Sequence, residues 1–179
     1  AVWFSQIQEP KVKKNLQRKH IIRDIRKLAN DVKETLKCRD KVREIVKKFA
    51  SHQSCFVLGK GKNEAIANEG ALKIKEISYI HAEGYSTSSL KHGPFALLYP
   101  SFPVIMIMPN DENYVKASNA YDEIKSREAF ILKITDKSKE QHQNGKSISN
   151  EVIVPENSTF ASLLTIIPIQ LLSYELSLL

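Results

Sequence analysis

The chain contains few cysteines, and the two that it has are far apart. Cys38 and Cys55 form no CxxC pair, which argues against a disulfide framework and favours a reducing compartment. We therefore expect a cytoplasmic protein. The first six residues include neither an initiator methionine nor the charged-then-apolar order of a secretory signal, so we also expect the chain to be cut from a longer protein.

Motifs that hold metals or nucleotide phosphates are missing as well. His81 and Glu83 have the spacing of the HxE motif of zinc deaminases, but no PCxxC follows them, so a metal site is not expected. Gly59-Lys60-Gly61 offers backbone amides at a helix start, yet Glu64 stands where a dinucleotide fingerprint has glycine, and no Walker A sequence is present. The turn is therefore neither a dinucleotide fingerprint nor a P-loop.

The basic residues are concentrated at one end and have no aromatic residues interleaved. Residues 1–50 hold 15 lysines and arginines against 6 acidic residues, a balance that could attract nucleic acid or a membrane surface. The same segment carries an apolar repeat at helical spacing, made of Ile21, Ile22, Ile25, Leu28, Ala29, Val32 and Leu36. We interpret it as an amphipathic helix with a solvated charged face, and we expect no nucleic-acid binding.

No uninterrupted apolar run is long enough to require a membrane. Residues 160–179 come nearest in composition, but they include Pro168, Gln170 and Glu175. A buried helix that closes a domain explains this segment without placing a carboxylate in hydrocarbon, so we expect no membrane span.

Short apolar runs alternate with helical patterns along the rest of the chain. We predict helices over residues 17–37 and 114–125, and a further helix after Asp40 as its N-cap. The predicted strands are residues 55–58, 103–108, 129–134 and 152–154, and residues 136–150 are predicted to be an exposed loop. Continuous apolar strands indicate an α/β fold with a mostly parallel sheet covered by helices on both faces. In such sheets ligands bind beyond the carboxyl ends of the strands, where we expect the loops after Leu58 and around residues 81–92.

The helix that we predict after the Gly59-Lys60-Gly61 turn carries acids and an amine on a single stripe. Glu69, Lys73 and Glu76 fall together on the helical wheel, beside an apolar arc. These residues are either exposed ion pairs of small energy or a site in which Glu76 moves a proton beside Lys73.

A histidine follows this helix in a tight turn. His92 lies in Leu90-Lys91-His92-Gly93-Pro94, where glycine and proline fix a turn that could present the imidazole to a ligand. A lone loop histidine is more often a surface residue, and spacing leaves both interpretations open.

These segments resemble the second sugar isomerase (SIS) domain of the glucosamine-6-phosphate synthases, which are glutamine:fructose-6-phosphate amidotransferases. The resemblance covers nearly the whole chain and is carried by four segments, residues 58–61, 69–83, 90–94 and 167–172. It implies a flavodoxin-like three-layer α/β/α fold, with residues 1–16 as a linker from a preceding domain and residues 17–179 as the SIS domain.

The resemblance also implies roles for particular residues. Glu76 matches the acid that moves a proton between C1 and C2 of the sugar, Lys73 its lysine partner, and His92 the histidine that opens the sugar ring from the neighbouring subunit. A homodimer is implied, and no metal or organic cofactor is needed. We expect the sugar phosphate to contact the glycine turn and the hydroxyl-rich segment, at Gly59, Gly61, Ser86, Thr87 and Ser88.

Some parts of the family's enzyme do not match this chain. Ser88-Ser89 replaces the usual Gly-Glu before the histidine turn, and Leu179 precedes the family's lysine-bearing tail. The first SIS domain and the glutaminase domain would be partners within the parent protein, so we expect the chain alone not to form glucosamine-6-phosphate. The alternative is a non-catalytic SIS module that binds a phosphosugar or nucleotide sugar through the hydroxyls of residues 86–88.

Overall fold

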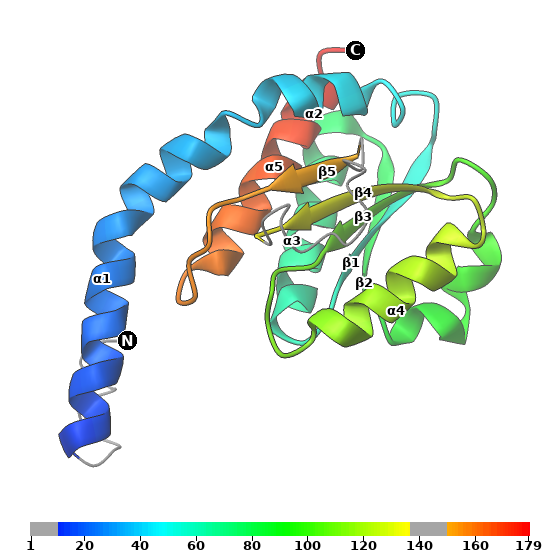
Figure 1. Ribbon diagram of the computed structural model, residues 1–179. Coiled ribbons are helices and arrows are strands. Elements are labelled where there is room, and N and C mark those ends of the chain that lie inside the picture. The colour runs from blue at the N-terminus through cyan, green and yellow to red at the C-terminus, as the bar shows by residue number, and fades with distance from the viewer. Residues whose placement is uncertain (1–10, 137–149) are drawn as a thin grey trace, which may run out of the picture.

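Five short strands form one parallel sheet in the computed structural model, which describes residues 11–136 and 150–179 (Figure 1). The strands lie in the order β2-β1-β3-β4-β5, and every paired neighbour is parallel. This is the strand order of flavodoxin-like folds, so the predicted fold class is confirmed. The strands are β1 (Ser54–Gly59), β2 (His81–Ser86), β3 (Pro103–Ile107), β4 (Phe130–Thr135) and β5 (Glu151–Ile153).

Helices cover both faces of the sheet, and the strands contribute side chains to two separate cores. On one face, α3 (Lys62–Ser78) and α5 (Ala161–Leu176) pack on alternate strand residues such as Val57 and Ile105. On the other face, α4 (Tyr114–Lys125) packs on the intervening residues, such as Leu58 and Met106. Burial on both faces explains why the strands are apolar without alternation.

Most of the predicted helices and strands are confirmed, and the differences concern single elements. The helix over 114–125 has the predicted bounds, and the four predicted strands match β1, β3, β4 and β5 to within about two residues. The strand β2 was not predicted, because its outward side chains, His81, Glu83 and Tyr85, are polar or partly exposed at the edge of the sheet. The N-cap prediction for Asp40 was wrong: Cys38 occupies that position, and Asp40 lies in the first turn of α2 (Arg39–Val46). Of the predicted loop over 136–150, residues 137–149 lie outside the described part of the chain.

The basic helix is longer than expected. α1 (Lys11–Leu36) begins before residue 17 and so includes the end of the segment assigned to a linker. Figure 1 shows its first half standing away from the sheet, while its second half approaches α5. Helix α5 is buried against the sheet as predicted. Among the described residues, no helix combines the length and apolar character needed to cross a bilayer.

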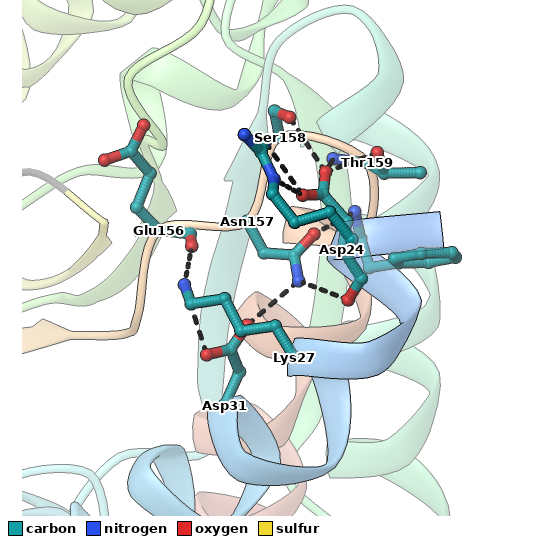
Figure 2. Close-up of polar contacts among 9 residues, drawn as sticks. Asp24, Lys27, Asp31, Glu156, Asn157, Ser158 and Thr159 are labelled. Carbon is teal, nitrogen blue, oxygen red and sulfur yellow. Dashed lines mark hydrogen bonds and ion pairs between the residues drawn. The ribbon is translucent and has the colours of Figure 1, made fainter. Parts of the chain in front are cut away.

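A polar network fastens α1 to the loop before α5 (Figure 2). The Asp24 carboxylate is buried and accepts hydrogen bonds from the Ser158 hydroxyl at 3.0 Å and from the backbone amide of Thr159 at 3.1 Å. The Thr159 hydroxyl donates a further bond at 2.5 Å. The hydrogen bond from the Thr159 hydroxyl is the main cause that lowers the pKa of Asp24 to about 2, and hydrogen bonds from Arg23 and Ser158 lower it further.

Asn157 extends this network to a second turn of α1. Its buried side-chain amide donates to the Asp24 carbonyl at 3.2 Å and to the Asp31 carboxylate at 2.9 Å. Its side-chain oxygen accepts from the Phe160 amide, immediately before α5. The loop therefore holds two turns of α1 and the start of α5 together.

Replacing Asp24 tests how strongly this network holds α1. We expect Asp24→Asn to lower the free energy of unfolding by about 1–3 kcal/mol, because a buried charged acceptor is lost. Since the pKa of folded Asp24 is below the value of 3.8 for an unperturbed group, its contribution is complete above that value and is lost as the pH falls towards 2. Urea unfolding at several pH values measures both effects.

The control for this test is Asp40→Asn, because the Asp40 side chain is 93% exposed. This variant should match the wild type throughout. Equal losses in both variants, or a loss in Asp24→Asn that does not shrink in acid, would contradict the role given to Asp24.

Candidate functional site

The carboxyl edge of the sheet brings together the five residues predicted to bind substrate. Gly59 and Ser86 end β1 and β2 as register partners. The backbone amide of Thr87 donates to the Gly59 carbonyl at 2.9 Å, which joins the segment after β2 to the turn after β1. Gly61 lies in that turn and precedes α3. The five residues therefore lie together at the carboxyl edge, and their contact with a sugar phosphate stays a prediction.

Packing explains Gly59, and backbone conformation explains Gly61. A Cβ atom on Gly59 would lie 2.1 Å from the carbonyl oxygen of Asn63, so the start of α3 could not approach β1. Gly61 has φ of +60°, a conformation that disfavours other residues. We conclude that the glycine turn positions α3 against the sheet, whatever it binds.

Three lysines that the sequence did not single out lie beside the same edge. The Lys60 ammonium donates to the Ser88 hydroxyl, and the Lys91 ammonium contacts the Glu123 carboxylate at 2.7 Å. Lys60, Lys91 and Lys116 line one hollow with Thr87 and Ser88. They come from three different elements, so no spacing in the sequence could have grouped them.

Helix α3 carries the predicted stripe of charged residues. The Lys73 ammonium lies 2.7 Å from the Glu76 carboxylate and 3.6 Å from that of Glu69. The hydrogen bond to Glu76 raises the pKa of Lys73, so the amine stays charged at neutral pH. About half of the Glu76 side chain is exposed. The ion pair is therefore formed on an open surface, and shielding from water must come from outside this helix.

The stripe ends near the amino edge of the sheet. Helix α3 runs back along β1: its start packs on Gly59 and Asn68 lies against Gly84, at the middle of the strands. Glu76 lies eight residues further along the helix, and β2 begins soon after, at His81. His81 was expected at the ligand-binding edge, but it lies at the opposite end of β2.

His92 lies on the other face of the sheet. It ends a short 3₁₀ helix, η2 (Ser89–His92), that follows the carboxyl end of β2. Leu90 anchors η2 in the core on the α4 side, while His92 itself is exposed. Gly93 then takes φ of +145°, a value that only glycine adopts without strain.

One copy of the chain therefore keeps Glu76 and His92 apart. Glu76 belongs to the helix on the α3 face and lies near the amino ends of the strands, whereas His92 follows a carboxyl end on the α4 face. A site that uses both residues needs a second chain.

A protein-family model described as the SIS domain matches residues 48–179. This region includes all five strands of the sheet, together with Glu76 and His92. The chain belongs to the SIS domain family. The matched SIS region starts after α2, so α1 and α2 lie outside it.

Relatives of this SIS chain include isomerizing glutamine–fructose-6-phosphate aminotransferases. One from Methanosarcina acetivorans is 38% identical over 161 residues, covering 89% of this chain and 26% of the enzyme. The isomerizing glutamine–fructose-6-phosphate aminotransferase 2 of Homo sapiens is 34% identical over 174 residues, covering 97% of this chain and 25% of the enzyme. The chain thus spans about a quarter of the length of these relatives.

Solved structures support the assignment of the chain to the SIS family. The C-terminal domain of the glucosamine-fructose-6-phosphate aminotransferase of Francisella tularensis superposes with a TM-score of 0.85 at 33% identity, over 92% of this chain and 46% of that one. A glucosamine-6-phosphate deaminase from Thermotoga maritima has a TM-score of 0.65 at 24% identity, over 85% of this chain and 43% of that one, and shows the shared SIS fold alone.

Gly59 offers a direct test of the packing explanation for the glycine turn. We expect Gly59→Ala to lower the free energy of unfolding by about 3 kcal/mol, because the new methyl group collides with the backbone of α3. Urea denaturation measures the loss. An unchanged unfolding midpoint would contradict the packing explanation.

Proposed function

We propose that the chain supplies the acid/base half of the isomerase site of a glutamine–fructose-6-phosphate aminotransferase. Such a site converts fructose-6-phosphate and ammonia from glutamine into glucosamine-6-phosphate. The observation that carries the proposal is the Lys73–Glu76 ion pair on an outward surface of α3, in a chain that resembles these enzymes over nearly its full length.

The chemistry assigned to these residues is proton transfer. After ammonia forms an imine at C2, Glu76 takes a proton from C1 and returns it to C2, a step suited to a positioned carboxylate. Lys73, held at 2.7 Å, keeps a positive charge beside Glu76 and steadies negative charge that develops on the sugar. His92 opens the sugar ring by moving a proton between the ring oxygen and the anomeric hydroxyl.

Partners complete this site in our proposal. A homodimer brings His92 of one copy to Glu76 of the other, because the two residues lie on opposite faces of one sheet. The first SIS domain and the glutaminase domain of the parent protein cover Glu76, provide ammonia and bind the sugar phosphate. We place the assembly in the cytoplasm, and we expect the chain alone not to form glucosamine-6-phosphate.

The test measures glucosamine-6-phosphate formation by the chain joined to these flanking segments. Glu76→Gln and His92→Ala should each lower the rate at least about a hundredfold, the usual contribution of a general acid or base. Glu69→Gln is the matched control, because Glu69 lies on the same stripe and is about as exposed as Glu76. Rates in Glu76→Gln and His92→Ala equal to the control would refute the assignment.

A second function is favoured by a different part of the molecule. The hydroxyls of Thr87 and Ser88 line a hollow at the carboxyl edge, away from Glu76. A non-catalytic module would use them to bind a phosphosugar or nucleotide sugar and signal its presence. Full activity of the Glu76→Gln variant, with binding retained at this hollow, would favour that alternative.

A further inference from the structure

We propose that helix α1 docks on a neighbouring protein domain through an apolar stripe that the described part of this chain leaves open to solvent. We call this feature the outer stripe; it consists of Ile22, Ile25, Ala29 and Leu36. The partner that fits it has an apolar groove with carboxylates along one side. The inference rests on the proposed function only in taking this partner to be the first SIS domain of the parent protein.

The side of α1 that faces its own domain is polar. Among residues 16–36, the three buried side chains are Asp24, Asp31 and Thr35, each at most 3% exposed. Figure 2 shows the two carboxylates turned towards the loop before α5, where they accept hydrogen bonds from Ser158 and Asn157. The domain therefore holds α1 largely through hydrogen bonds.

The outer stripe faces a different direction. Its four residues share one side of the helix, about a third of a turn from the buried carboxylates. Ile25 is 48% exposed and Leu36 is 47% exposed, Ala29 is exposed and Ile22 is partly buried. The aliphatic side of α1 is thus open to solvent while its polar side is buried, which is the arrangement expected of a helix that joins two domains.

Charge indicates what kind of surface the partner presents. Lys19, Arg26 and Lys33 are exposed and form a row along one border of the outer stripe, since they are seven residues apart. Glu34 is the one exposed acidic residue among residues 16–36, and it contacts Lys37 at 2.7 Å. The border is therefore strongly basic, and carboxylates are the groups that complement it.

Other occupants fit the outer stripe less well. Two copies of α1 packed through their outer stripes bring two strongly basic helices together, and their repulsion disfavours a dimer formed there. Helices that lie on membranes carry tryptophan, phenylalanine and leucine on the apolar face, whereas the outer stripe has one leucine and no aromatic residue. A partner within one parent protein is consistent with the Francisella tularensis domain, of which this chain covers 46%.

Hydrogen–deuterium exchange of residues 16–23 tests the docking. Mass spectrometry compares the chain alone with the chain joined to the flanking segments of its parent. The first half of α1 stands away from the sheet (Figure 1), so these amides should exchange at least about tenfold more slowly in the joined protein, because docking suppresses local unfolding.

Variants of the joined protein identify the groups responsible. Ile25→Glu should abolish the protection without changing the unfolding midpoint of the chain alone, because the Ile25 side chain is already 48% exposed there. Arg26→Glu should weaken the protection, whereas Arg26→Lys, which keeps the charge, should retain it. The matched control is Val115→Glu, since Val115 is an aliphatic residue of α4 that is 71% exposed on the other face of the sheet. It should keep the protection.

Several outcomes would overturn the proposal. Equal exchange of residues 16–23 in the chain alone and in the joined protein would do so, as would equal losses in Ile25→Glu and Val115→Glu. Protection of the chain alone that rises with its concentration would assign the outer stripe to a second copy. Protection that needs phosphatidylserine vesicles would assign it to a membrane.

The same variants separate this inference from the proposed function. Activity retained by Glu76→Gln in the joined protein would refute the catalytic assignment and leave the protection of α1 unchanged. An inactive Glu76→Gln variant, together with an unprotected α1 in the active joined protein, would refute the docking alone.

Discussion

All the paired strands run in the same direction, and this constraint decides where each candidate side chain lies. A helix that follows a parallel strand must return along the sheet before the next strand can begin. α3 therefore starts on Gly59 at the carboxyl edge and carries Glu76 towards the amino edge. The segment after β2 crosses instead to the α4 face, where Leu90 anchors η2 and His92.

This arrangement gives the chain two separate candidate surfaces. The first is the α3 stripe, where Lys73 and Glu76 form a close ion pair that is still open to water. The second is the hollow on the α4 face that Lys60, Thr87 and Ser88 line, where the Lys60 ammonium donates to the Ser88 hydroxyl. Proton transfer needs a site closed to solvent, so the role proposed for the first surface requires that other domains cover it, whereas the second surface is formed within the chain.

The sequence predicted most of the fold because two-sided burial leaves a clear pattern. Runs such as residues 55–58 and 103–108 are continuously apolar, since each side chain packs on one helical layer or the other. The edge strand β2 lacks that pattern, because His81 is exposed and Glu83 and Tyr85 are only partly buried. The helical stripe of Glu69, Lys73 and Glu76 was predictable from spacing, because neighbours on a helix are fixed by its period.

Contacts between segments that are far apart in the chain could not be predicted from the sequence. Asp24 and Thr159 are 135 residues apart, yet their hydrogen bonds fasten α1 to the loop before α5. The hollow lined by Lys60, Lys91 and Lys116 depends on where three segments meet, although Lys60 and Lys91 lie within motifs that the sequence had singled out. The separation of Glu76 from His92 likewise follows from strand direction and from the crossing after β2, neither of which a motif records.

Complementation between two inactive variants of the joined enzyme tests the shared site most directly. Co-expressed Glu76→Gln and His92→Ala subunits assemble at random, and each mixed dimer contains one site with both residues intact. The account predicts recovery of about a quarter of the wild-type rate, since about half of the dimers are mixed and each has one of two sites. A mixture as inactive as its two parents, with mixed dimers demonstrated by tagged subunits, would contradict it.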